Sequence, residues 1–308
     1  MVASGKNNKL IVILGPTSSG KTGLSIKLAK KFNGEVVSAD SRQVYKGMDI
    51  GSGKVTKKEM AGIPHHLLDV ANPRKRFSVA QYQKLALKTI RNIQKKDRIP
   101  FLVGGTGFYI QSIVDGIIIP EVKPDWNLRK KLEKLTLEQL FDKLKKLDPE
   151  RAKAIDNQNP RRLVRALEIV LKTGKPVPSK QFSAGDGPAK GWDILQIGVE
   201  KPRNELKNLI HKRLIKRLKN NAMINEVKKL HKSGVSWKRL EEFGLEYRFV
   251  AQYIQNKISY QKMSDNIQIE SEHYAKRQMT WFKRDNRILW VQNYSESQKW
   301  CQKFLLTK

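Results

Sequence analysis

Short apolar runs alternate with amphipathic segments over the first third of the chain. Residues 9–14 (KLIVIL) form a continuous aliphatic run, and residues 35–39 (EVVSA) and 100–103 (PFLV) form shorter ones. Runs of this kind are typical of strands buried on both faces of a parallel sheet. Residues 22–32 and 78–96, which lie between these runs, have the periodicity of amphipathic helices. The alternation predicts a doubly wound α/β domain with right-handed crossovers.

The pattern changes beyond residue 120. Leucines recur at helical spacing through residues 125–173, a segment rich in proline and glycine follows at 174–191, and strand-like runs return at 194–199 and 288–291. A helical block between sheet elements is most simply an insertion into the α/β domain. We therefore expect a core in residues 1–120, a helical insertion in residues 121–190, and the rest of the core with C-terminal helices in residues 191–308.

Composition adds a strong positive charge to this picture. The 61 Lys and Arg residues outnumber the 29 Asp and Glu residues and give a net charge of +32, while 39% of the residues are hydrophobic. The hydrophobic content is enough for a packed core, so global disorder is excluded. A surplus of this size attracts polyanions such as nucleic acid. The charge is dense in residues 207–219, which contain six basic residues and no acid.

Cysteine content and hydropathy indicate in which compartment the protein is expected. Cys301 is the only cysteine, which excludes an internal disulfide and a thiolate metal cluster. No stretch approaches the roughly 20 apolar residues that a transmembrane helix needs. We expect a soluble, cytoplasmic protein that does not bind membranes.

The clearest chemical motif follows the first predicted strand. Residues 15–22 (GPTSSGKT) match G-x-x-x-x-G-K-[S/T] and lie between a strand and a helix, which is the context that a phosphate-binding P-loop requires. Backbone amides and the helix N-terminus would bind phosphate oxygens. Lys21 would add a full positive charge, and Thr22 a hydroxyl ligand for Mg²⁺. The loop suits a nucleotide and a diphosphate equally well. Its residues are Gly15, Pro16, Thr17, Ser18, Ser19, Gly20, Lys21 and Thr22.

Two polar residues follow neighbouring predicted strands. Asp40 ends the strand at 35–39, and Thr106 follows the strand at 100–103. Ligands of such sheets bind at the carboxyl ends of the strands. Asp40 would act there as a general base or would hold Mg²⁺ through water. Because Ser38 interrupts the apolar run before Asp40, the match to the acidic strand of ATP-hydrolysing P-loop proteins is poor.

Several further stretches, taken together with the P-loop, resemble the tRNA dimethylallyltransferase (tRNA isopentenyltransferase) family. These occur in order as SADSRQVY at 38–45, MDIG at 48–51, GIPHHLLD at 62–69, GGTGFY at 104–109, NPRRLVRALE at 159–168 and YAKRQMTW at 274–281. The resemblance implies transfer of a dimethylallyl group from dimethylallyl diphosphate to N6 of the adenosine 3′ of a tRNA anticodon. The implied partners are this diphosphate, the tRNA anticodon stem-loop and Mg²⁺, and a monomer is expected.

The resemblance also implies roles for particular residues. Asp40 would be the catalytic base, with Thr106 beside it. An arginine of the basic segment would bind the diphosphate; Arg213 and Arg217 both remain candidates, and Arg217 is preferred. The residues implied to contact tRNA are Asp40, Ser41, Arg42, Gln43, Thr106, Arg129, Arg161, Arg162, Arg165, Arg248, Lys276, Arg277, Gln278 and Trp281.

The sequence departs from the family pattern at three places. Arg161 stands where the family usually has glutamine. Leu245 and Glu246 stand between a glycine and Tyr247 in a turn where the family has these two adjacent, and the segment leading to Glu226 is shorter than usual.

Two other functions fit parts of the sequence. A P-loop kinase would use the same loop for ATP, although the poor acidic strand speaks against it. A non-catalytic RNA-binding protein would not need the intact Lys21–Thr22 pair with Asp40 nearby.

His65 and His66 are residue types that often bind metals, but adjacent residues of an extended chain point in opposite directions and no partner has ligand spacing. A hydrogen-bonding role is favoured for them.

Overall fold

The computed structural model describes residues 8–117, 119–120, 122–177 and 191–307. By its contacts the chain divides into two compact units, residues 1–115 with 188–308, and residues 116–187. The sequence-based boundaries at 121 and 190, and most of the segment at 174–191, lie outside the described residues.

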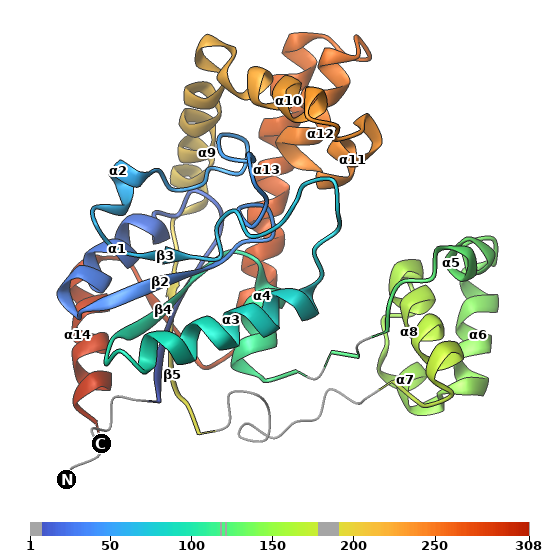
Figure 1. Ribbon diagram of the computed structural model, residues 1–308, viewed down its shortest axis with the longest axis horizontal. Helices are drawn as coiled ribbons and strands as arrows, with labels where there is room; N and C mark the ends of the chain where they lie inside the picture. The colour runs from blue at the N-terminus through green and yellow to red at the C-terminus, as the bar shows by residue number, and fades with distance from the viewer. Residues whose placement is uncertain (1–7, 118, 121, 178–190, 308) are drawn as a thin grey trace. The chain divides into compact units, whose positions relative to one another are not determined.

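The first unit is built on a parallel sheet (Figure 1). Its order is β3-β2-β4-β1-β5-β6, and every neighbouring pair is parallel. The sequence-based fold class, a P-loop-like parallel sheet flanked by helices, is confirmed. The short β3 was not anticipated. The strands are β1 (Lys9–Leu14), β2 (Gly34–Ala39), β3 (His65–His66), β4 (Ile99–Gly104), β5 (Asp193–Val199) and β6 (Ile288–Val291).

Helices cover both faces of the sheet, so its central strands are fully buried. Ile11 and Ile13 of β1 pack with α1 (Lys21–Lys31) and α14 (Tyr294–Leu306). Alternate residues of the same strand point to the other face, where α3 (Val79–Gln94) and α4 (Gly107–Val114) lie. The continuous apolar run of β1 follows from burial on both faces.

The C-terminal part of the first unit is helical. A 3₁₀ turn (Lys219–Asn221) joins α9 to α10, and Asn220 and Asn221 both have left-handed backbones with φ near 54°. Asparagine tolerates this conformation better than most residues. The connection lies in the segment that leads to Glu226. The helices are α9 (Arg203–Leu218), α10 (Ala222–Lys232), α11 (Trp237–Phe243), α12 (Leu245–Ile254) and α13 (Tyr260–Phe282), and a short α2 (Lys57–Met60) lies earlier in the chain.

The second unit has its own hydrophobic core. Leu140 and Leu144 of α6 pack against Leu163 and Leu167 of α8 and are almost fully buried. Its helices begin at side-chain caps, as the polar residues before each apolar run require. They are α5 (Trp126–Leu132), α6 (Leu137–Leu147), α7 (Pro149–Ala154) and α8 (Pro160–Thr173).

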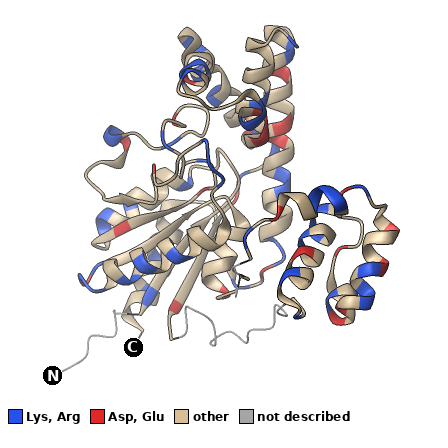
Figure 2. Cartoon of the chain, turned by 45° about the vertical axis from the view of Figure 1, so that its right-hand side comes forward, with Lys and Arg blue, Asp and Glu red and all other residues tan. Residues whose placement is uncertain are grey.

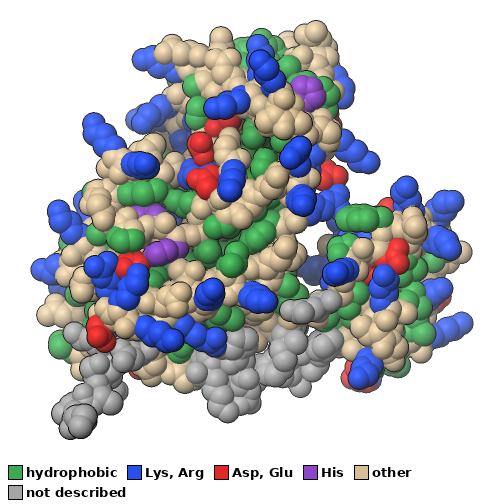
Figure 3. All heavy atoms as spheres, viewed as in Figure 1, with side chains coloured by type: hydrophobic (Ala, Val, Ile, Leu, Met, Phe, Trp, Pro, Cys, Tyr) green, Lys and Arg blue, Asp and Glu red, His purple; other side chains and the backbone are tan. Residues whose placement is uncertain are grey.

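Basic side chains are distributed over both units. Lys and Arg occur on most helices (Figure 2), and on the face drawn in Figure 3 they are scattered rather than gathered on one element. Among the described residues, no helix is both long enough and apolar enough to cross a bilayer.

Candidate functional site

The P-loop lies between β1 and α1, at the carboxyl end of the central strand of the sheet. Gly15 (φ 155°) and Gly20 (φ 87°) have backbones that favour glycine, and a side chain on Gly15 would overlap the carbonyl of Val199. The turn carries the loop directly into the N-terminus of α1 at Lys21. The hydroxyl of Ser19 is buried there and has no hydrogen-bond partner in the part of the chain that the structure describes. An unpaired buried donor in this loop fits the binding of an anion.

The lysine of the loop carries a destabilised charge. Lys21 Nζ donates to the carbonyl of Pro16 at 2.9 Å. Burial, with a further contribution from Arg213, lowers the pKa of Lys21 to about 8, against the opposing influence of Asp40. Burial and the nearby Arg217 lower the pKa of Arg213 to about 10. These depressed values show cations held close together in a poorly solvated place, which an anion would stabilise.

The two arginines of α9 have different partners. Arg213 Nη1 donates to Thr17 Oγ1 in the P-loop at 2.9 Å. Arg217 Nη1 donates to Glu246 Oε1 at 2.7 Å and to the carbonyl of Gly51 at 3.1 Å. Arg213 therefore contacts the P-loop directly, whereas Arg217 is paired with a carboxylate. Arg217 Nη2 is buried without a hydrogen-bond partner among the described residues, so both arginines stay candidates for binding the diphosphate. Glu246 is one of the two residues by which the sequence departs from the family turn.

Asp40 and Thr106 meet at the ends of β2 and β4. Asp40 Oδ1 accepts from the amides of Arg42 (2.8 Å) and Gln43 (3.2 Å). Thr106 Oγ1 accepts from the amide of Ser41 at 3.0 Å, which ties the two loops together. The charge of Asp40 acts on Lys21 and Arg213, so its carboxylate lies near the P-loop. Within the described residues, Asp40 Oδ2 has no hydrogen-bond partner.

One face of α13 packs against the P-loop and the loop after β4. Gln278 Oε1 accepts from the amide of Thr17 at 2.8 Å, and its Nε2 donates to the carbonyl of Gly105 at 2.8 Å. Trp281 lies against Gly107, where any side chain would overlap its ring. Gln278 is only 6% exposed. Its position differs from that expected of a surface contact to tRNA, because both ends of its amide are bonded inside the protein.

The remaining residues of the first unit that the sequence singled out for tRNA contact lie at or near the surface. Arg42 Nε donates to the carbonyl of Phe243 at 2.8 Å, and Gln43 Nε2 donates to that of Gly53 at 3.3 Å. Arg248 bonds the carbonyl of Glu241 at 3.2 Å. Lys276 and Arg277 of α13, which the sequence also singled out for tRNA contact, are exposed.

The arginines of the second unit fall into two groups. Arg129 and Arg165 both bond the fully buried carboxylate of Glu168, at 2.7 Å and 2.5 Å. These bonds and the amide of Asp125 hold the pKa of Glu168 to about 2, although burial alone would raise it. The structure thus gives Arg129 and Arg165 a role inside the unit. Arg161 and Arg162, by contrast, are exposed.

The residues of the P-loop fit a magnesium ion that arrives with a phosphorylated ligand. Thr22 is exposed at the start of α1, and no hydrogen bond of its hydroxyl is found among the described residues. Mg²⁺ prefers oxygen ligands and usually retains waters while it binds substrate phosphates. Over the described part of the chain, no cluster of three or more His, Cys, Asp or Glu side chains has the geometry to hold a metal. The ligand would therefore supply much of the coordination.

The two histidines of β3 have hydrogen-bonding roles. His66 Nε2 is 2.6 Å from the buried carboxylate of Glu35, and His65 Nδ1 is 2.8 Å from the carbonyl of Ile63. They face different partners, which agrees with the sequence-based preference.

The fold and this arrangement define a P-loop protein with a half-buried cationic site suited to a phosphorylated ligand and a carboxylate near it. The chain belongs to the IPP transferase family, whose model matches residues 43–285. The family expected from the sequence motifs is confirmed.

Relatives and solved structures agree with this assignment. A tRNA dimethylallyltransferase from Caldanaerobacter subterraneus subsp. tengcongensis is 40% identical over 287 residues, which cover 92% of this chain and 91% of the relative. A crystal structure of a tRNA isopentenylpyrophosphate transferase from Bacillus halodurans superposes with a TM-score of 0.72 at 35% identity, over 97% of each chain. A eukaryotic dimethylallyltransferase acting on tRNA gives a TM-score of 0.78 at 27% identity, over 96% of this chain and 77% of that one.

Sequence reasoning missed residues that the fold brings to the site. Tyr274 of α13 lies near Asp40 and Thr106, and burial raises its pKa to about 12. Tyr274, Gln278 and Trp281 follow each other at spacings of four and three residues, which places them on one helix face. That spacing in the sequence indicates that the three side chains contact the same part of the protein. Glu226 of α10, which bonds the backbone of Gly51, had no such local signal.

Proposed function

We propose that this protein transfers a dimethylallyl group from dimethylallyl diphosphate to N6 of the adenosine 3′ of the anticodon in tRNA. The names of the relatives support the reaction class. The observation that carries the proposal is the pair of destabilised cations, Lys21 and Arg213, at a P-loop that lies near Asp40. Such a site combines a place for a diphosphate with a carboxylate that can accept a proton.

The first requirement of the reaction is a stabilised leaving group. As the bond between the allylic carbon and oxygen breaks, positive charge develops on carbon and negative charge on the departing diphosphate. Lys21, Arg213 and the amides of the P-loop lie where they would bind that negative charge. Preorganised charges of this kind lower the barrier because they need no reorganisation during the reaction. No bond to phosphorus is made or broken.

The second requirement is removal of a proton from the attacking amine. N6 of adenine forms the new bond to the allylic carbon, and one of its protons must leave. Asp40 Oδ1 is engaged by the amides of Arg42 and Gln43, which fixes the carboxylate and leaves Oδ2 to accept the proton. Thr106, beside it, is held by Ser41 and contributes a hydroxyl at the same place.

The hydroxyl of Thr22 would hold Mg²⁺, which would supply positive charge to offset the negative charge of the leaving group. The adenosine must leave its stack to reach Asp40, at a cost of a few kcal/mol that contacts to the flipped base offset.

The exposed basic side chains of both units supply sequence-independent attraction for tRNA.

The test is mass spectrometry of tRNA incubated with protein, Mg²⁺ and dimethylallyl diphosphate. We expect a dimethylallyl mass gain on the adenosine next to the anticodon, and consumption of the diphosphate only when tRNA is present. A parallel reaction with labelled ATP tests the kinase alternative. Label transfer from ATP without any dimethylallyl gain would reject the proposed function, and Lys21→Met serves as the inactive control.

A further inference from the structure

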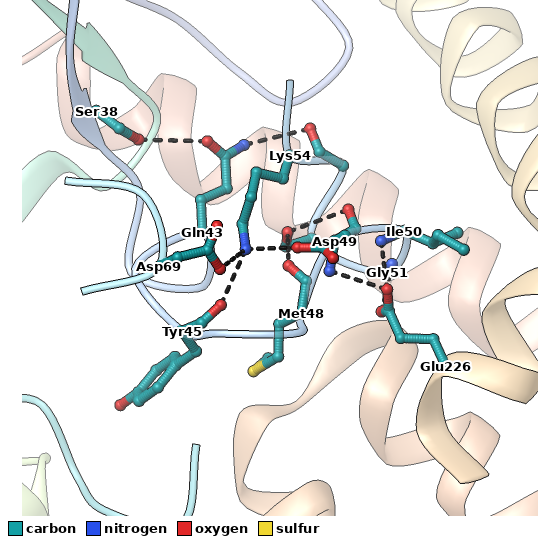
Figure 4. Close-up of polar contacts among 12 residues, drawn as sticks. Ser38, Gln43, Tyr45, Met48, Asp49, Ile50, Gly51, Lys54, Asp69 and Glu226 are labelled. Carbon is teal, nitrogen blue, oxygen red and sulfur yellow. Dashed lines mark hydrogen bonds and ion pairs between the residues drawn. The ribbon is translucent and has the colours of Figure 1, made fainter. Parts of the chain in front are cut away.

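A buried glutamate of α10 holds a loop that belongs to the neighbourhood of the P-loop. Glu226 Oε2 accepts from the amides of Asp49 (2.9 Å) and Ile50 (2.6 Å), and its Oε1 accepts from the amide of Gly51 at 3.0 Å (Figure 4). The residue is 9% exposed. Successive backbone amides that converge on one carboxylate form an anion-binding nest. The loop at 49–53 is thus fixed to α10 by a carboxylate of the protein itself.

Tyr247 extends this contact by one residue. Its hydroxyl donates to Glu226 Oε1 at 2.8 Å and accepts from the amide of Ser52 at 3.1 Å. Burial, together with the charge of Glu226, raises the pKa of Tyr247, so the phenol keeps its proton at neutral pH. The amides of residues 49–52 are therefore all bonded to Glu226, either directly or through Tyr247.

The loop is also braced by bonds of its own. The amide of Gly53 bonds the carbonyl of Ile50 at 3.1 Å, and the amide of Lys54 bonds that of Asp49 at 2.9 Å. On the side away from Glu226, Lys54 Nζ lies 2.6 Å from Asp49 Oδ1 and 2.5 Å from Asp69 Oδ1 (Figure 4). Because these bonds stiffen the loop, its attachment to Glu226 sets the position of its other end.

Carbonyl groups of the loop contact both arginines of the site, which belong to α9. The carbonyl of Gly51 accepts from Arg217 Nη1 at 3.1 Å, and the carbonyl of Gly53 lies 3.5 Å from Arg213 Nη2. Gly53 has a left-handed backbone (φ 61°), and any side chain there would overlap both guanidinium groups. Arg213 in turn bonds Thr17 of the P-loop. A continuous series of contacts therefore leads from Glu226 to the P-loop.

We propose that Glu226 is a positioning residue for diphosphate binding. Through the loop at 49–53 it places the guanidinium groups of Arg213 and Arg217 next to each other, with Arg213 against the P-loop, without itself contacting the ligand. The inference rests on the proposed function for the nature of the ligand. It goes beyond that function because it assigns a role to Glu226 of α10, which would position the arginines of α9.

The test uses the full-length protein and inorganic diphosphate as the probe, with calorimetric titration in the presence of Mg²⁺. We expect Glu226→Ala to weaken diphosphate binding by at least about tenfold, the loss that corresponds to about 1.4 kcal/mol, and to leave the Kd for tRNA unchanged. Acetate should restore much of the affinity, because the vacated amides can bind its carboxylate. Glu226→Gln keeps the size but loses an acceptor, and should give an intermediate loss.

A matched control separates positioning from general destabilisation. Glu35 is another buried carboxylate of the same unit, at the opposite end of β2 from Asp40, and bonds His66 and Arg98. Glu35→Gln should lower the melting temperature without changing the diphosphate Kd. If Glu226→Ala does not fold, Glu226→Gln and Tyr247→Phe carry the test.

The outcomes are distinct. Wild-type protein that fails to bind diphosphate would overturn the proposed function and this inference with it. Wild-type binding that is unchanged in the Glu226 variants would overturn the inference alone. A loss that Glu35→Gln reproduces, or that acetate does not relieve, would show a merely structural role.

Discussion

Asp40 illustrates how one side chain at the end of a strand serves both the fold and the proposed reaction. Its Oδ1 accepts from two backbone amides and so holds the turn after β2, while its Oδ2 is left for chemistry. The turn contact and the proposed catalytic role could compete for the same carboxylate. In the structure they fall on different oxygen atoms, so both are compatible with the same residue.

The first prediction at this scale separates the two roles. Asp40→Asn keeps an oxygen for the amides of Arg42 and Gln43 but cannot accept a proton. We expect kcat for dimethylallyl transfer to fall by about 10²–10⁴, with the melting temperature and the tRNA Kd unchanged. Asp40→Ala should lose the turn contacts as well and melt earlier. Normal turnover by Asp40→Asn would remove Asp40 from the role of base.

The second prediction concerns Lys21 and pH. Its pKa of about 8 lies below the ordinary value of 10.5, so the ammonium loses its proton as the pH rises through about 8. An anion binds the protonated form, and diphosphate affinity should therefore be full below pH 8 and decline above it. Lys21→Arg keeps its charge and should abolish this decline. The diphosphate itself also titrates, but it does so equally with the wild-type protein and with Lys21→Arg. If diphosphate affinity declined with pH equally in both proteins, the decline could not be assigned to Lys21.

At the scale of elements, α13 connects the surface to the P-loop. Lys276 and Arg277 are exposed on this helix, while Gln278, between them and Trp281, bonds both the P-loop and the loop after β4. Glycines at 105 and 107 allow the helix to approach this closely, because a side chain at either position would overlap α13. The helix therefore sets the spacing of two loops that come from different strands.

Substitution of Gln278 tests this element. Gln278→Leu removes the bonds to Thr17 and Gly105, and a loss of about 1 kcal/mol or more per buried bond should weaken diphosphate binding by about tenfold. Gln261→Leu is the matched control, since Gln261 is exposed on the same helix and its side chain bonds Asp265 alone among the described residues. Equal diphosphate affinities in the two variants, measured by calorimetry, would argue against a role of α13 in placing the P-loop.

At the scale of the whole molecule, the basic residues behind the net charge of +32 have two kinds of role, in binding and in structure. Some cations, such as Arg129 and Arg165, neutralise a buried carboxylate. Others, such as Arg161 and Arg162, are exposed and able to reach phosphates. The number of counterions released on tRNA binding should therefore be far smaller than the total charge.

The prediction at this scale contrasts two arginines of the second unit. Arg162→Ala should weaken tRNA binding and reduce the slope of log K against log salt by about 1, with little change in stability. Arg129→Ala leaves Glu168 underpaired and should cost about 3–5 kcal/mol of stability in that unit. Filter binding over a salt series and thermal melting distinguish them. The reverse result would mean that Arg129 binds tRNA and that Arg162 stabilises the unit.

The sequence by itself determined the local features of this protein. Apart from the short β3, apolar runs predicted the strands close to their observed bounds, from β1 at Lys9–Leu14 to β6 at Ile288–Val291, because burial on both faces of a sheet demands them. The P-loop needs only consecutive residues in one turn, so its signature was complete in eight positions. Asp40 and Thr106 were placed correctly at strand ends, because parallel strands bring their carboxyl ends to one edge of the sheet.

Only the tertiary structure decided which distant side chains complete the site. Arg213 rather than Arg217 meets Thr17 across 196 positions of sequence, and Glu226 meets Gly51 across 175. Arg213 and Arg217 lie one helical turn apart and carry the same charge, so no local pattern separates them. Glu246 separates them by pairing with Arg217, and that contact exists only once α9 and α12 have packed together. Contacts of this kind depend on how helices meet, which periodicity does not encode.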